Sequence, residues 1–348
     1  MKRLFGLVAV CCLSASIAPV AAQTGALEKK SIVISVGGSI SQMNKVAYAI
    51  ALNKKFFEQE GLGVESVAFP SGTAGLQTLI AGGSDVSEGA FEHMLRMQAK
   101  GISLTCITVF DRYPGNVLVV TKANADKIKT IADLKGKTIG ISAPGAATHN
   151  FVAQLLERAG VHWQDASYVS VGTGLSAVAA VRTGGQLDAL VNLDPAITAL
   201  TDTGEATVLA DSRNEAGTRA AFGGPYLSDC MFAKTEFIKN NPNTAQAVAN
   251  ATVHAMQWLK TASIDDIIAS LPKDYYQADE ALYRKSLKQN IDGFTWDGIV
   301  DRSAVQNVLD SISVLQPEMK QAKLDLGLTY DNGLVEKALK KYGSPAKP

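Results

Sequence analysis

The chain has 348 residues, of which 47% are apolar and 19% are charged, and its 33 basic residues balance its 33 acidic ones. This length exceeds what one hydrophobic core ordinarily supports, so it predicts two lobes. The balanced charge argues against nucleic acid or an anionic membrane surface as a partner. Aromatic residues make up only 7% while glycine is common, a composition typical of helices packed closely on sheets in α/β proteins.

The first 22 residues have the pattern of an export signal. Lys2 and Arg3 give a positive start, residues 4–17 are mostly apolar, and a run of small residues ends at Ala22. A transmembrane anchor, the alternative, needs about twenty consecutive apolar residues, and two serines and a proline interrupt this run. We therefore expect a periplasmic protein that is cleaved after Ala22 and begins at Gln23.

Residues 23–115 are predicted to form the first part of one α/β lobe. Strands are expected at 31–36, 63–69, 85–88 and 103–110, and helices at 44–60, 74–82 and 91–100. Short β-branched runs that alternate with helical patterns are typical of βαβ units, so the sheet is expected to be parallel.

Residues 116–225 are predicted to form a second α/β lobe. Its strands are expected at 116–121, 138–142, 166–171 and 187–192, and its helices at 130–135, 149–159 and 175–183. After a Gly-Gly-Pro break, residues 226–348 begin with a strand at 226–233 and continue with helices at 242–261, 279–289, 302–312 and 333–342. We expect this segment to return to the first lobe, because otherwise that lobe's sheet would lack covering helices.

Five strand-to-helix turns are rich in small residues that can form hydrogen bonds. In open α/β sheets, ligands bind beyond the carboxyl ends of the strands, so these turns are expected to face one crevice. The first-turn amides and the positive end of each helix attract anionic or accepting groups. The alternative is that these residues only form turns. The predicted ligand-binding residues are Ser39, Ser41, Ser71, Gly72, Thr73, Gly89, Ala90, Ser142, Gly145, Ala146, Thr148, Gly172 and Thr173.

Four further side chains are candidates for setting the charge of the ligand. Glu88 and Asp194 could bind a cation, Arg112 could bind an anion through two hydrogen bonds, and His149 begins a predicted helix beside a binding turn. Each has a structural alternative, since Asp194 could cap a helix, Arg112 could bridge an acidic neighbour and His149 could be an ordinary helix residue. Trp296 could line the crevice, although packing is the simpler role.

The sequence offers no support for catalysis, a metal or a cofactor. Residues 172–174 lack the third glycine of a dinucleotide fingerprint, and no Gly-Lys-Ser or Gly-Lys-Thr follows a glycine-rich loop. The chain has no Gly-x-Ser-x-Gly motif, and its four histidines lie far apart without the spacing of metal ligands. We therefore expect a protein that is not an enzyme and needs no cofactor.

Several segments together resemble the sulfonate, taurine and nitrate-type solute-binding proteins of ABC transporters, which are also named for their likeness to thiamine-pyrimidine synthesis proteins. Residues 131–140 contain Asp-Leu-Lys-Gly-Lys at the entry to the second lobe, and residues 69–91, 144–156 and 187–195 match as well. The resemblance implies a type II periplasmic-binding-protein fold with two crossovers and a helical C-terminal region on lobe I. It implies a monomer that binds a small-molecule solute between its lobes and delivers it to an ABC permease.

The identity of the solute stays open at this point. Thr148 and His149, after a proline-containing loop, are similar to the taurine and sulfonate binders, which implies a small organic anion or zwitterion. Glu88 adds negative charge to the predicted cleft. A thiamine-type pyrimidine or an aromatic carboxylate is the alternative ligand. Enzymes of pyrimidine synthesis share the fold, but they need a cysteine-rich motif that this chain lacks, and a ligand sensor is a third alternative.

Removal of the signal would leave two cysteines, Cys106 and Cys230. Two thiols cannot frame a disulfide scaffold, but an oxidising compartment allows one disulfide. The resemblance places the two cysteines on neighbouring strands of lobe I, which implies that their side chains are close enough to react.

Overall fold

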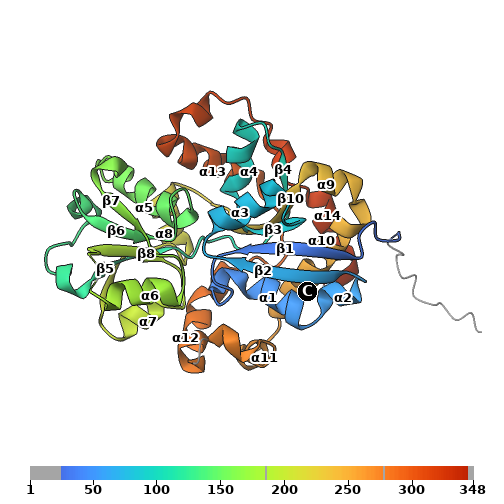
Figure 1. Ribbon diagram of the computed structural model, residues 1–348, viewed down its shortest axis with the longest axis horizontal. Coiled ribbons are helices and arrows are strands. Elements are labelled where there is room, and N and C mark those ends of the chain that lie inside the picture. Colours follow the sequence, from blue (N-terminus) through green and yellow to red (C-terminus); the bar gives the residue numbers. More distant parts are fainter. Residues whose placement is uncertain (1–24, 185, 277–278, 344–348) are drawn as a thin grey trace, which may run out of the picture.

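The computed structural model describes residues 25–184, 186–276 and 279–343, which form two α/β lobes that each contain a five-stranded sheet (Figure 1). The predicted export signal lies outside these described residues. The strand order is β2-β1-β3-β10-β4 in lobe I and β7-β6-β8-β5-β9 in lobe II. The strands are β1 Ser31–Gly37, β2 Gly63–Phe69, β3 Val86–Ala90, β4 Leu104–Val109, β5 Val117–Thr121, β6 Thr138–Ile141, β7 Ser167–Ser170, β8 Ala189–Asn192, β9 Ala206–Asp211 and β10 Asp229–Lys234.

Both sheets are mixed, which corrects the prediction of a parallel sheet. The βαβ strands β1, β2 and β3 are parallel, as are β6, β7 and β8. By contrast, β10 is antiparallel to both β3 and β4, and β5 is antiparallel to both β8 and β9. The chain enters β5 and β10 directly from the other lobe instead of through a covering helix, so these two strands are free to run in the opposite direction.

Helices cover both faces of each sheet, so the central strands are buried. Long helix α10 begins at Pro242, which suits a first helical position, and its alanines allow close packing against lobe I. The helices are α1 Val46–Asn53, α2 Phe56–Gln59, α3 Gly72–Ala81, α4 Glu92–Ala99, α5 Ala147–Arg158, α6 Leu175–Arg182, α7 Ala196–Asp202, α8 Glu215–Phe222, α9 Thr235–Asn240, α10 Pro242–Leu259, α11 Ile264–Ala269, α12 Glu280–Asn290, α13 Arg302–Leu315 and α14 Asn332–Tyr342.

Sequence patterns missed some elements between the predicted ones. The helix predicted at 44–60 divides into α1 and α2, because Lys55 adopts a left-handed backbone conformation with φ of 60°. Strand β9 and helices α7, α8, α9 and α11 were not predicted. They are short segments that lack an extended apolar periodicity.

The C-terminal helices divide their contacts between the lobes. Helices α10 and α14 pack on lobe I, as expected. In Figure 1, α13 lies above and α12 lies below the boundary between the lobes, and both helices contact lobe II as well as lobe I. In one apolar cluster, Val305 and Val308 of α13 join Phe151 of α5, Phe222 of α8 and Phe91 of lobe I. Helix α13 therefore links the two lobes through apolar packing.

Cys106 and Cys230 lie on the neighbouring strands β4 and β10, as the resemblance implies. Both are buried thiols in the structure. Burial, followed by a hydrogen bond with Cys106, raises the pKa of the Cys230 thiol well above its ordinary value. The two side chains are thus in contact, and a disulfide between them stays a prediction.

Within the described ranges, no helix combines the length and the apolar character that crossing a membrane requires.

Candidate functional site

The glycine- and serine-rich turns of both lobes meet around a small cavity of about 40 Å³. Its lining includes seven of the predicted binding residues, namely Gly72, Gly89, Ala90, Ser142, Ala146, Thr148 and Thr173. The other lining residues are Gly37, Gln42, Asn44, Lys45, His93, Ala147, Leu193 and Asp229. The cavity is small because residues of lobe I and lobe II contact each other at its edge.

The lobe I wall of the cavity consists of the ends of β1 and β3 and the start of α3. Ser71 caps α3 by accepting a hydrogen bond from the Ala74 amide at 3.3 Å. Gly37 packs directly on this turn, since a Cβ atom at Gly37 would lie 2.5 Å from the Cα of Gly72. Glycine is therefore required at position 37. Beside this cap, the buried hydroxyl oxygen of Thr73 has no hydrogen-bond partner.

The lobe II wall is the start of α5. Thr148 Oγ1 accepts a hydrogen bond from the Ser142 amide at 2.9 Å and lies 2.7 Å from the Ser142 hydroxyl. These contacts fix the loop between β6 and α5, so the first-turn amides of a 12-residue helix face the cavity. The wall thus offers hydrogen-bond donors to an accepting group of a solute.

Two predicted residues join the lobes across the cavity edge. The Ser39 amide of lobe I donates to Thr173 Oγ1 of lobe II at 2.8 Å, and the Ser39 hydroxyl lies 2.8 Å from that of Ser41. Gly172 lies behind Thr173, and its carbonyl accepts from the Asn192 amide group at 3.1 Å. The turn around Thr173 is therefore held by contacts to both lobes.

A buried ion cluster forms the floor of the cavity. Lys45 Nζ lies 2.6 Å from Glu88 Oε2 and 2.6 Å from Asp229 Oδ2, and all three residues are at most 5% exposed. The side-chain amide of Asn44 also donates to Asp229 Oδ2. Glu88 was predicted as a site residue, and it lies beneath the lining with Lys45 as its partner.

Burial and charge shift the pKa values of this cluster. Burial alone would lower the pKa of Lys45, but Asp229 and Glu88 raise it above its ordinary value. Burial raises the pKa of Glu88 to about 8, because the loss of hydration outweighs the attraction of a lysine that Asp229 shares. Lys45 is thus a permanent cation, held by two carboxyl groups.

Asp111 adds a third buried carboxyl group next to the ion cluster. It is 3% exposed, its Oδ2 has no hydrogen-bond partner, and it lines a cavity of about 10 Å³ that shares Asn44 and Leu193 with the central cavity. Burial, followed by repulsion from Asp229, raises the pKa of Asp111 well above its ordinary value.

His93, to which the sequence reasoning gave no role, lines the cavity from the first turn of α4. It is 3% exposed, and its Nε2 has no hydrogen-bond partner. Burial, together with the positive charges of Arg96 and Lys45, lowers the pKa of His93 to about 3, so the ring is neutral at pH 7. Its position three residues after the end of β3 is the local signal that could have identified it.

His93 is expected to make stability depend on pH. The pKa of His93 is lower in the folded state than its ordinary value of 6.5. The stability that His93 contributes is therefore full above pH 6.5 and is lost as the pH falls towards 3. The stability advantage of the wild type over His93→Gln should therefore shrink by about 1.4 kcal/mol per pH unit across this window. Urea unfolding of both proteins at pH 7, 6, 5 and 4 measures it, and a difference independent of pH would contradict it.

Gly145 and His149 lie behind the cavity instead of lining it. The Gly145 amide donates to His149 Nδ1 at 3.1 Å, and the Gly145 carbonyl accepts from Arg96 of lobe I at 2.8 Å. The His149 ring packs edge-on against Trp163 and Tyr168. Burial, followed by the charge of Arg96, lowers the pKa of His149. In the structure, His149 therefore orders the binding loop.

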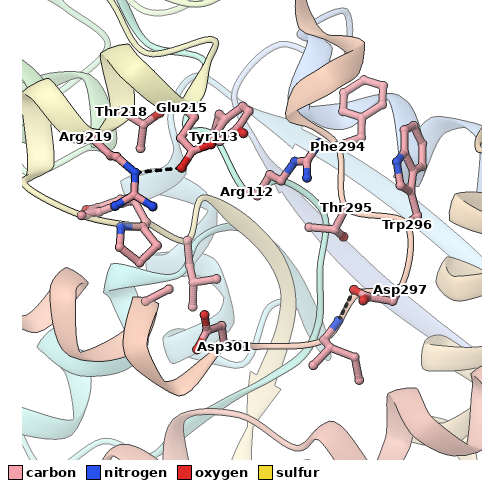
Figure 2. A pocket seen from close by; sticks show the side chains of 16 residues that line it. Arg112, Tyr113, Glu215, Thr218, Arg219, Phe294, Thr295, Trp296, Asp297 and Asp301 are labelled. Carbon is pink, nitrogen blue, oxygen red and sulfur yellow. Dashed lines mark hydrogen bonds and ion pairs between the residues drawn. The ribbon is translucent and has the colours of Figure 1, made fainter.

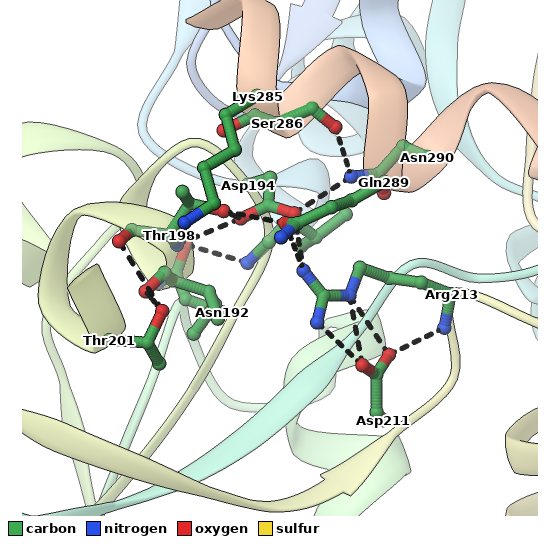
Figure 3. Close-up of polar contacts among 12 residues, drawn as sticks. Asn192, Asp194, Thr198, Thr201, Asp211, Arg213, Lys285, Ser286, Gln289 and Asn290 are labelled. Atoms are coloured by element: carbon green, nitrogen blue, oxygen red, sulfur yellow. Dashed lines mark hydrogen bonds and ion pairs between the residues drawn. The ribbon is translucent and has the colours of Figure 1, made fainter. Parts of the chain in front are cut away.

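Asp194 lies outside the cavity, in a polar network between the lobes (Figure 3). Its Oδ2 accepts from Arg213 at 2.9 Å and from Asn290 of α12 at 2.7 Å, while its Oδ1 accepts from Thr198 at 2.7 Å. Gln289 Oε1 of α12 accepts from Arg213 at 2.8 Å and from Thr198 at 2.9 Å. We call Asp194, Thr198, Arg213, Gln289 and Asn290 the α12 network.

Arg112 and Trp296 line a different and larger cavity, of about 400 Å³, between α8 and the loop before α13 (Figure 2). Several of its charged groups are already paired. Arg112 donates to the Asp292 carbonyl at 2.9 Å, and Arg219 pairs with Glu215 at 2.8 Å. No buried polar side-chain atom among its lining residues lacks a partner, in contrast to the cavity between the turns. The smaller cavity is therefore the stronger candidate for a specific site.

The donor set of the site does not suit a metal ion. Across the described parts of the chain, no three His, Cys, Asp or Glu side chains are grouped so that they could hold a metal. The carboxyl groups at the cavity floor are instead arranged around Lys45.

A family model described as NMT1/THI5 like matches residues 42–262. The chain belongs to the NMT1/THI5-like family. A protein of known structure from Bordetella bronchiseptica RB50 has 35% sequence identity and a TM-score of 0.88, and the match covers 92% of this chain and 100% of that one. A search of curated proteins finds no match. The resemblance drawn from the sequence motifs is confirmed.

More distant structures share the fold of this NMT1/THI5-like protein. The alkanesulfonate-binding protein SsuA from Xanthomonas axonopodis pv. citri, bound to MOPS, has 21% identity and a TM-score of 0.66, with 90% of this chain and 99% of that chain covered. The periplasmic nitrate-binding protein NrtA from Synechocystis PCC 6803 has 14% identity and a TM-score of 0.71, with 92% and 91% covered. The chain therefore has the periplasmic-binding-protein fold.

Proposed function

We propose that the protein is the extracytoplasmic solute-binding component of an ABC importer. It captures a small organic anion or zwitterion, such as a sulfonate or a taurine-like solute, and delivers it as a monomer to a permease in the cytoplasmic membrane. The observation that carries this proposal is the cavity between the lobes, where first-turn amides of α3 and α5 face each other. The SsuA and NrtA structures, whose names give sulfonate and nitrate as ligands, support the same class of solute.

Binding is coupled to closure of the lobes. A solute that touches Gly72 on lobe I and Thr148 on lobe II makes its full set of contacts only when the lobes are closed. Such a solute shifts the population towards the closed state, because only that state gains the binding energy. The two crossovers between the sheets, near residues 114–117 and 223–226, are the expected hinge.

The ionisable groups of the cavity support binding without catalysis. Lys45 is held by two carboxyl groups and burial lowers the pKa of His93 to about 3, so neither of these two lining residues exchanges a proton readily near neutral pH. Glu88, whose pKa is raised to about 8, lies beneath the lining and does not line the cavity. The side chains that line the walls are otherwise small, or they contact their own loops.

The test is solute binding by the purified mature protein. We expect at least one compound in a panel of sulfonates, aminosulfonates, carboxylates and pyrimidines to raise the melting temperature and to bind in calorimetry. Thr148→Val should weaken this binding, whereas Arg112→Ala, outside the cavity, should leave it unchanged. A panel without any stabilising solute, together with no small molecule released on denaturation of the purified protein, would contradict the proposal.

A further inference from the structure

Buried carboxyl groups outnumber cations at the floor of the cavity. Glu88, Asp229 and Asp111 are 1%, 5% and 3% exposed, and Lys45 is the cation that pairs with Glu88 and Asp229. Arg96 of lobe I is already bonded to Glu92, Asn150 and a carbonyl of lobe II. Among the described residues, Lys45 is the one cation that lines the central cavity, and Arg213, which lines the adjoining cavity of Asp111, is paired with Asp211 and Asp194.

Two buried oxygen atoms near the cavity floor have no hydrogen-bond partner. Asp111 Oδ2 and Asn44 Oδ1 are buried and have no partner, and the Asn44 amide nitrogen is committed to Asp229. Asn44 and Leu193 line both the cavity of Asp111 and the central cavity, so the two spaces adjoin. A group that donates several hydrogen bonds satisfies these oxygen atoms, whereas an added anion would be buried among carboxyl groups at a high cost.

The walls of the cavity have the reverse preference. Helices α3 and α5, of 10 and 12 residues, direct their first-turn amides towards the cavity, and positively polarised helix ends favour accepting oxygens. The cavity is thus polarised, with an acidic floor and donating walls.

We propose that the solute is an amino-bearing zwitterion whose protonated amine binds the acidic floor formed by Asp229, Asp111 and Asn44. Its acid group then lies at the first turns of α3 and α5. This inference rests on the proposed function and narrows it, because it selects aminosulfonates and amino acids over plain sulfonates and carboxylates. It assigns to Asp111, whose carboxyl group lacks a partner at Oδ2, the role of a specificity determinant.

The first test compares matched solutes on the wild-type protein by calorimetry. Taurine and ethanesulfonate differ by the amine alone, as do β-alanine and propionate. We expect the amine-bearing member of at least one pair to bind about tenfold or more tightly than its partner, the ratio typical of one charged hydrogen bond. Equal or tighter binding of the amine-free members would overturn the inference and leave the proposed function standing. Absence of binding by all four, and by the wider panel, would overturn both.

The second test uses Asp111→Asn, which keeps the shape of the side chain and removes its ability to become a carboxylate beside a bound amine. We expect this variant to bind the amine-bearing solute about tenfold more weakly and to bind the amine-free partner unchanged or more tightly. Asp126→Asn, at a fully exposed aspartate of lobe II, is the matched control and should change neither affinity. An equal loss for both solutes in Asp111→Asn would overturn the specific role of Asp111. If that variant does not fold, the wild-type comparison decides.

Discussion

Replacing Lys45 by methionine is expected to lower the free energy of unfolding by about 3–5 kcal/mol at pH 7, the usual cost of removing one partner from a buried ion pair. Methionine fills a similar volume, so the loss comes mainly from the carboxylate of Asp229, which would remain buried without its cation, and from Glu88, which would lose its hydrogen-bond donor. Urea unfolding followed by circular dichroism measures the change.

The loss in Lys45→Met is expected to be smaller at pH 5 than at pH 8. Burial raises the pKa of Glu88 from its ordinary value of 4.5 to about 8. The contribution of Glu88 to stability is therefore full below pH 4.5 and is lost as the pH rises through 8. Without Lys45 the acids must be protonated to remain buried, which acidic solution favours. Adding Glu88→Gln and Asp229→Asn should recover much of the loss, because it removes the unpaired charges. An equal loss at both pH values would contradict this explanation.

Removing the α12 side of the α12 network is expected to open the lobes. The double variant Gln289→Ala and Asn290→Ala eliminates three hydrogen bonds between lobes, of 2.7 to 2.9 Å, to Thr198, Arg213 and Asp194. With about 0.5–1.5 kcal/mol for each bond, the open state gains population and solute affinity should fall by about tenfold or more.

Small-angle scattering of the solute-free protein and calorimetry with the solute test this expectation. The radius of gyration should increase in the double variant and return towards the wild-type value when the solute is saturating. Gln306→Ala on α13 is the control, because Gln306 is exposed and bonds to Asp310 of its own helix. An unchanged scattering profile with unchanged affinity would show that the α12 network does not hold the closed state.

Local signals predicted most of the framework. The β-branched runs located β1, β2 and β6, and the glycine- and serine-rich turns identified Gly72 and Thr148 as residues that line the cavity. These features depend on neighbours in the sequence, and a single chain displays them directly. The antiparallel course of β5 and β10 was not predicted, since it depends on how the chain crosses between the lobes.

The charged half of the site was mostly missed for the same reason. Lys45 reads as a solvated helix residue until Glu88 and Asp229, from two distant strands, are placed beside it. Asp194 was predicted to face a ligand, but the side chains that surround it come from residues near 213 and 290. Contacts between segments that are distant in the sequence decide which charged side chains face the cavity. The spacing of residues along the chain does not reveal these contacts.

The packing of helix α13 affects how a bound solute is released. Because Val305 and Val308 pack in one apolar cluster with residues of both lobes, separation of the lobes must slide α13 across one of its neighbours and wet that surface. Part of the closing force therefore exists without any solute. In the proposed delivery to a permease, release of the solute therefore requires work against this apolar packing as well as against the contacts to the solute, and the permease would have to supply it.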